Sequence, residues 1–123
     1  MNKLTLNNDA EDKKIITFTI NREIKQRLRE TLINDTHYNL KKKSDWVNEA
    51  VIFLKQNSDY KEIICNAEGN NKDFVFDKIY MTFKQRCFFF EIRNEVVKAY
   101  PDISGPQAAI IRAAILSRIT RKT

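Results

Sequence analysis

Four consecutive residues combine three ammonium groups with a hydroxyl. Lys41, Lys42, Lys43 and Ser44 stand where a polar stretch gives way to an apolar helical pattern, so they are expected at the start of a helix. The first backbone N–H groups of a helix lack partners within the helix and lie at the positive end of its dipole, which favours a phosphate. A charge run is more often a solvated face, but its place at a helix start predicts phosphate binding here.

Residue types used in catalysis and metal binding are few and scattered. Cys65 and Cys87 form no C-x-x-C pair and have no histidine cluster beside them, so both are expected as reduced thiols, with Cys87 buried. His37 is the only histidine and falls in a predicted loop, and with two glycines the chain has no glycine-rich phosphate loop. We therefore expect no enzyme, no cofactor and no metal site.

The charge of the chain is basic and unevenly distributed. Its 22 Lys and Arg residues outnumber 16 Asp and Glu, for a net charge of +6, and the positive excess lies in residues 13–55 and 78–123. Such a balance indicates a polyanionic partner, most often nucleic acid. No apolar run approaches the ~18 residues of a membrane span, and the first residues lack a signal-peptide core. A cytoplasmic protein without membrane contact is expected.

The first basic block, residues 13–56, follows a flexible arm predicted at 1–12. Ile16, Phe18 and Ile20 alternate with polar residues, as in a short strand with one buried face. Asn21 is the expected N-cap of a following amphipathic helix. An apolar stripe from Trp46 to Leu54 predicts a second helix.

The second basic block, residues 78–123, repeats this order after a connector at 57–77 in which Ile63 and Ile64 suggest a helical turn. The pattern predicts a strand over 79–83, a helix that ends before Pro101 and a second helix opened by a Ser104–Gln107 capping box. The strands align at an offset of 63, Ile16 on Ile79 and Ile20 on Phe83, and the helices at 64, which indicates an internal repeat. The alternative is that two amphipathic stretches fall into register by chance.

These blocks resemble the ribbon-helix-helix superfamily, the group of the Arc and MetJ repressors. The resemblance is carried by residues 16–21 and 44–51 in the first block and by 79–83 and 110–115 in the second, and it spans about two thirds of the chain. It implies a mainly α fold with a short antiparallel β-ribbon, in which two ribbon-helix-helix units of one chain form a pseudo-dimer. In that family the ribbon enters the major groove of DNA. Pro106 and Ala108 depart from the family pattern, which puts anion binding at the second unit in doubt.

Because the ribbon of that family enters the major groove, the resemblance implies that outward strand residues of this chain contact DNA. Hydroxyls donate or accept at base edges, and the Thr methyl contacts a thymine methyl. The candidate base-reading residues are Ile15, Thr17, Thr19, Lys78, Tyr80 and Thr82. The candidate phosphate-binding residues are Lys41, Lys42, Lys43, Ser44, Ser104, Gly105, Arg22, Lys84 and Arg86. Outside this fold, Thr and Tyr would simply be good solvent-facing strand residues.

The expected function is sequence-specific binding of double-stranded DNA, as a transcriptional regulator or as a plasmid accessory protein of conjugation. The tandem, single-chain arrangement further resembles TraY-type accessory proteins, which implies a relaxase or other transfer protein, and further copies of the chain on DNA, as partners. The alternative is an antitoxin-type protein-interaction module that binds a toxin and autoregulates its operon. The short stretch after the last predicted helix disfavours that alternative.

Overall fold

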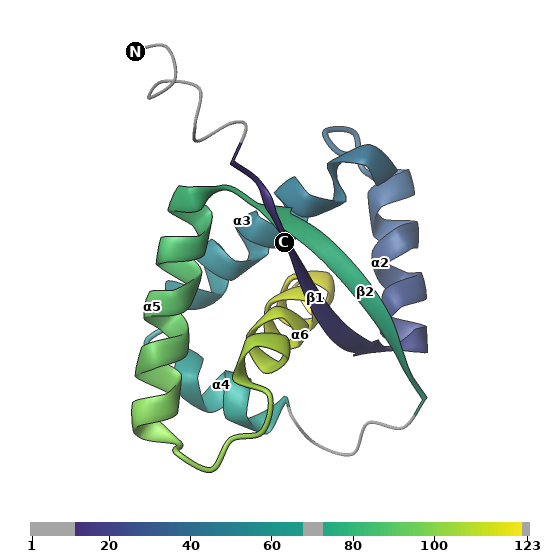
Figure 1. Cartoon of the computed structure of the whole chain (residues 1–123). Helices are drawn as coiled ribbons and strands as arrows, with labels where there is room; N and C mark the ends of the chain where they lie inside the picture. Colours follow the sequence, from purple (N-terminus) through teal and green to yellow (C-terminus); the bar gives the residue numbers. More distant parts are fainter. Residues whose placement is uncertain (1–11, 68–72, 122–123) are drawn as a thin grey trace, which may run out of the picture.

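The order strand, helix, helix occurs twice along the chain. The computed structural model describes residues 12–67 and 73–121. Strand β1 (Lys14–Asn21) leads into α2 (Arg22–Asn34), a 3₁₀ turn η1 (Leu40–Lys42) and α3 (Lys43–Lys55). After α4 (Tyr60–Asn66), strand β2 (Phe74–Met81) leads into α5 (Phe83–Ala99) and α6 (Pro106–Thr120). The prediction of a mainly helical fold with one antiparallel ribbon is confirmed (Figure 1).

The two strands pair along their full length as an antiparallel ribbon. Lys14 lies opposite Met81 and Asn21 opposite Phe74, so segments far apart in the sequence are joined side by side. Period-two alternation then gives the ribbon two faces. The inward face of β1 buries Phe18 and Ile20, and that of β2 buries Ile79 and Met81. The predicted orientation of the apolar strand positions toward the helices is confirmed for these residues.

The limits of β2 differ from the prediction. The strand begins at Phe74, inside the predicted connector, and ends at Met81. Phe83, expected on the inward face of the strand, is the first residue of α5 and is exposed. The alignment of Ile20 with Phe83 is therefore wrong, because Ile20 is a buried strand residue.

The helices pack on one side of the ribbon. Figure 1 shows the ribbon crossing one side of the molecule, with α3 and α6 behind it and α2 and α5 flanking them. The most extensive helix–helix contact joins α3 to α6, while α6 also contacts β1 and α3 contacts β2. Each second helix therefore lies against the strand from the other half of the chain.

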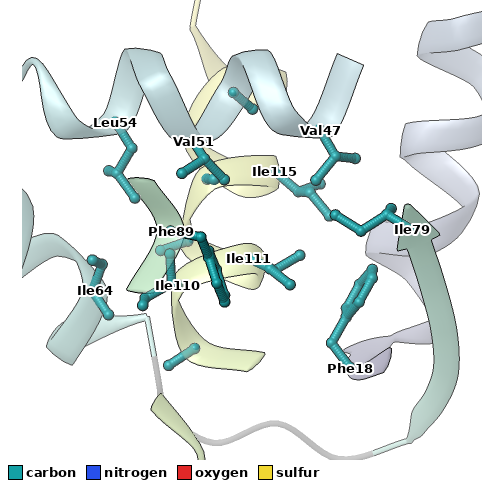
Figure 2. Packing of buried hydrophobic residues seen from close by; sticks show 14 of the residues in the cluster. Phe18, Val47, Val51, Leu54, Ile64, Ile79, Phe89, Ile110, Ile111 and Ile115 are labelled. Carbon is teal, nitrogen blue, oxygen red and sulfur yellow. The ribbon is translucent and has the colours of Figure 1, made fainter. Parts of the chain in front are cut away.

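A single hydrophobic core joins both strands and helices α2 to α6, and Figure 2 shows part of it. Its centre combines Val47 and Val51 of α3 with Ile110, Ile111 and Ile115 of α6, all buried. Burying one side chain of this size contributes roughly 1.5–3 kcal/mol relative to leaving it exposed. The remaining buried hydrophobic residues are Phe18, Ile20, Leu28, Leu32, Trp46, Ala50, Leu54, Tyr60, Ile64, Ile79, Met81, Phe89, Ile92, Val96, Ala109, Ala113 and Ala114. Because both halves of the chain contribute, we expect them to fold together.

The connector takes part in this core. The helical turn predicted at Ile63 and Ile64 is confirmed as α4, which buries Ile64 completely and Tyr60 almost completely. On α5 the inward face falls on Phe89, Ile92 and Val96. Cys87 lies on the opposite side of that helix and is exposed, so its predicted burial is wrong.

The residues at which the helices begin are set by hydrogen bonds and residue types close by in the sequence. Asn21 caps α2 as predicted, and its side chain accepts from the N–H groups of Glu23 at 2.8 Å and Ile24 at 3.3 Å. The capping box predicted at Ser104 is wrong. The residue before α6 is Gly105, with a left-handed φ of 56°, and Pro106 opens the helix. Proline suits the first helical position because its missing N–H would have no partner within the helix.

Within the described residues, no helix combines the length and the apolar character that crossing a lipid bilayer requires.

Candidate nucleic-acid interface

The outer face of the ribbon, defined as Ile15, Thr17, Thr19, Phe76, Lys78 and Tyr80, faces away from the helices. Across the two strands, Ile15 lies opposite Tyr80, Thr17 opposite Lys78, and Thr19 opposite Phe76. Ile15 and Tyr80 keep 49% and 43% of their surface exposed, and Thr17 and Lys78 between them are also exposed. The structure therefore brings five of the six predicted base-reading residues onto one open surface.

Thr82, the sixth predicted base reader, lies outside this surface. It follows the last strand residue and caps α5, where its hydroxyl accepts from the N–H of Gln85 at 3.2 Å. The Gln85 side chain accepts in turn from the Thr82 N–H at 2.9 Å, completing a capping box. The Thr82 hydroxyl is therefore used to cap α5. The prediction that Thr82 is a strand residue is wrong.

Phe76 occupies a place on the outer face that was not predicted from the sequence. It is 79% exposed, the largest value among the exposed large hydrophobic residues of the described chain. The period-two rule would have found it, because counting back from buried Ile79 and Met81 turns every even-numbered residue of β2 outward. The position was missed because residues 57–77 were predicted to form a connector.

Thr19 is held by a residue from the other half of the chain. One terminal nitrogen of Arg112, on α6, donates to the Thr19 hydroxyl at 2.9 Å and to the Thr19 carbonyl at 3.0 Å. The hydroxyl therefore acts as an acceptor toward Arg112, and its own hydrogen remains available for an acceptor outside the protein. The bond from Arg112 fixes the position of the Thr19 hydroxyl and leaves its hydrogen to be donated.

Helix α3 binds the outer backbone edge of β2 in a similar way. The Tyr80 N–H donates to the Ser44 hydroxyl at 2.9 Å, and the Tyr80 carbonyl accepts from the Asn48 side chain at 3.0 Å. Asn48 is buried and also donates to the Ser44 carbonyl at 2.8 Å. Both backbone groups of Tyr80 are thus satisfied. Ser44, predicted to bind phosphate, uses its hydroxyl oxygen to accept a hydrogen bond from the strand.

The three lysines before and at the start of α3 differ in their surroundings. Lys41 and Lys42 lie in η1 and are exposed. Lys43 instead pairs with Asp77 of β2 at 2.6 Å, with side-chain exposures of 29% and 6%. The second carboxylate oxygen of Asp77 is buried without a hydrogen-bond partner among the described residues. The charge of Lys43 is therefore balanced within the protein, whereas Lys41 and Lys42 face solvent.

The remaining predicted phosphate-binding residues lie near the ribbon ends and at the start of α6. Arg86 is mostly buried and donates to the Asp12 carboxylate at 2.9 Å and to the Met81 carbonyl at 2.8 Å, so it joins α5 to the end of β2 and to the segment before β1. Arg22 is exposed and pairs with Asp73 at 3.2 Å. Lys84, Ser104 and Gly105 are exposed. Arg86 and Arg22 are thus both paired with carboxylates of the protein.

One hollow lies away from the outer face. It is an open groove of about 740 Å³ between α2 and the Val75–Asp77 edge of β2, lined by Leu28, Leu32 and Leu40 together with Arg22, Lys25 and Arg29. Among the described residues no group of three or more His, Cys, Asp or Glu side chains is placed to hold a metal ion.

No model of a protein family matches the sequence, and comparison with curated proteins and with solved structures finds no match.

Proposed function

We propose that this chain binds double-stranded DNA in a sequence-specific manner by inserting the β1–β2 ribbon into the major groove. The observation that carries the proposal is the outer face itself. It presents hydroxyl, phenol, ammonium and apolar groups to solvent, while α3 and α6 pack on the other side of the ribbon. Two strands about 4.8 Å apart fit a groove about 12 Å wide, which admits a two-stranded ribbon.

The proposal includes two ribbon-helix-helix units that pair within one chain. Two pairs of residues support it. Asn21 and Thr82 cap the first helix of each half and are 61 positions apart. Asn48 on α3 reaches the Tyr80 carbonyl, and Arg112 on α6 reaches the Thr19 carbonyl, so each second helix donates to the opposite strand. Thr19 and Tyr80 are also 61 positions apart, which makes 61 rather than 63 the offset of the two strands.

This offset pairs the outer-face residues of the two halves. Ile15 corresponds to Phe76, Thr17 to Lys78, and Thr19 to Tyr80. A homodimeric ribbon presents the same side chains twice, whereas each of these pairs joins two different residue types. Under this proposal, the ribbon therefore recognises a DNA site that lacks two-fold symmetry.

Phosphate contacts would come from the charged residues beside the ribbon. Lys41 and Lys42 are exposed next to the start of α3, where the helix dipole favours an anion. The corresponding start of α6 offers Ser104 and Gly105, which carry no charge. The proposal therefore expects one end of the DNA footprint to be held more strongly than the other.

An oriented DNA-binding protein of this kind fits two biological roles. One is a cytoplasmic transcriptional regulator, and the other is a plasmid accessory protein of conjugation that positions a relaxase beside its site. In both roles further copies of the chain would bind neighbouring DNA. The outer face supports DNA recognition for either role.

Selection of bound duplexes from a random pool tests the proposal. We expect the wild-type chain to enrich one asymmetric sequence. Thr17→Ala and Tyr80→Ala should weaken binding to that sequence by about 1–3 kcal/mol and should weaken binding to random DNA much less. Thr120→Ala, at the far end of α6, is the matched control and should leave both unchanged.

Neutralising Lys41 and Lys42 tests the phosphate contacts separately. Binding to specific and random DNA should weaken alike, and the slope of log K against log salt should flatten by roughly 0.9 for each phosphate that the protein no longer neutralises. A pool in which no sequence is enriched would contradict the proposal. A two-fold symmetric site for one molecule would contradict its asymmetric form.

A further inference from the structure

Phe76 is the most exposed large hydrophobic residue of the described chain. Its side chain stands on the outer face opposite Thr19, between Phe74 and Lys78 along β2, and it is 79% exposed while Phe74 is 39% exposed. Phe18 and Phe89 are buried in the core, and the other exposed phenylalanines, Phe74 and Phe83, keep less of their surface open than Phe76 does. Covering a large apolar side chain is favourable, and the described part of the chain leaves this ring open.

The neighbours of Phe76 indicate what kind of surface covers it. Thr19 is held by Arg112 with its hydroxyl hydrogen available, and Lys78 adds an exposed ammonium group. Both are suited to hydrogen-bond acceptors such as O6 and N7 of guanine or O4 of thymine. A surface that contacts all three residues must place an apolar group beside such acceptors.

In the major groove one base supplies the apolar group. Thymine carries a C5 methyl group next to its O4 acceptor, whereas the groove edges of guanine, adenine and cytosine lack a methyl group. Phe76 and Lys78 are separated by about 7 Å along the strand, which corresponds to roughly two base-pair steps. The apolar contact and the contact of Lys78 therefore fall on different bases of one site.

We infer that Phe76 is a specificity-determining residue that selects a thymine by covering its C5 methyl group in the major groove. The inference rests on the proposed function, because it requires the ribbon to lie in the groove. It adds the chemical identity of one base and assigns its recognition to a residue outside the predicted set.

Replacement of thymine by deoxyuridine provides the test, because it removes the methyl group and keeps the hydrogen-bonding edge. Each thymine of the selected site is replaced in turn, and binding is measured by fluorescence anisotropy with the full chain. At one thymine we expect wild-type affinity to fall about fourfold, as for the loss of one buried methyl-sized group. Phe76→Ala should bind both duplexes equally at that position, which a double-mutant cycle reports as coupling.

Phe83→Ala is the matched control, since Phe83 is an exposed phenylalanine at the start of α5 rather than on the ribbon. It should retain the full effect of the deoxyuridine replacement. If Phe76→Ala keeps the same sensitivity as wild type at every thymine, the assignment of Phe76 is overturned while ribbon recognition stands. If the wild-type chain prefers no duplex sequence, the proposed function fails, and the assignment fails with it.

Discussion

Asn48→Ala removes the side chain that joins α3 to the edge of β2. Asn48 is buried and donates to the Ser44 carbonyl at 2.8 Å and to the Tyr80 carbonyl at 3.0 Å. Each hydrogen bond contributes about 0.5–1.5 kcal/mol net, and a buried carbonyl left without a partner adds to the loss. Alanine recovers about 0.6 kcal/mol because it favours the helix more than asparagine does. We expect the free energy of unfolding to fall by roughly 2 kcal/mol.

Urea unfolding followed by circular dichroism measures this change, and the midpoint of thermal unfolding should fall by roughly 6–12 °C for a chain of this size. Asn94→Ala on the exposed surface of α5 is the matched control and should be neutral or slightly stabilising. Hydrogen exchange at the Tyr80 amide should also accelerate in the Asn48 variant, because α3 holds that strand edge. An Asn48→Ala protein within about 0.5 kcal/mol of wild type would refute the view that these bonds stabilise the fold.

Two further predictions concern ionisable groups. Asp77→Asn removes the partner charge of Lys43; under the proposed function we expect tighter binding to random DNA and a salt dependence steeper by roughly 0.9, and an unchanged slope would show that Lys43 makes no phosphate contact. The hydrogen bond to Glu49 and partial burial raise the pKa of Tyr38 above its usual value near 10, so the neutral phenol stabilises the fold fully below pH 10 and this contribution is lost as the pH rises through the raised pKa. Thermal melts between about pH 9 and pH 11.5 should therefore show a smaller loss of stability in Tyr38→Phe than in wild type, and equal losses would exclude this linkage.

The two strands show where local pattern is sufficient and where it fails. β1 was predictable because the inward residues Phe18 and Ile20 are apolar and alternate with the polar residues Thr17 and Thr19. The first half of β2 inverts that pattern, with Phe76 outward and Asp77 inward. An inward carboxylate is tolerated because Lys43 reaches it from a position 34 residues earlier. A pattern read over a short stretch of neighbouring residues cannot reveal a partner at that distance.

The helix starts show a different limit, because one motif occurs twice with different outcomes. Thr82 and Gln85 form a capping box, whereas Ser104 and Gln107 match the same spacing and form none. The difference is Pro106, which takes the first helical position and leaves Gly105 as the cap. The box at Thr82 was therefore readable from sequence, and recognising it would have ended β2 before Thr82.

Contacts between the two halves of the chain were beyond the reach of sequence. The bonds from Asn48 to Tyr80 and from Arg112 to Thr19 span 32 and 93 positions, respectively. The aligned repeat placed Asn48 and Arg112 in equivalent positions without suggesting that either side chain binds a strand. Their role follows only from the antiparallel register, which sets the outer backbone edge of each strand against the opposite second helix.

Joining both halves in one chain has a physical consequence for the proposed function. In a homodimer any change in the ribbon appears at two positions, so both half-sites must accept it. In the proposed repeat, β2 carries Phe76 and Asp77 at the positions that Ile15 and Ile16 occupy in β1. α4 supplies core residues such as Ile64 from a segment that occurs once. Each half is therefore free to acquire its own contacts, and the resulting asymmetry would give the protein a fixed orientation on DNA, which a symmetric ribbon does not provide.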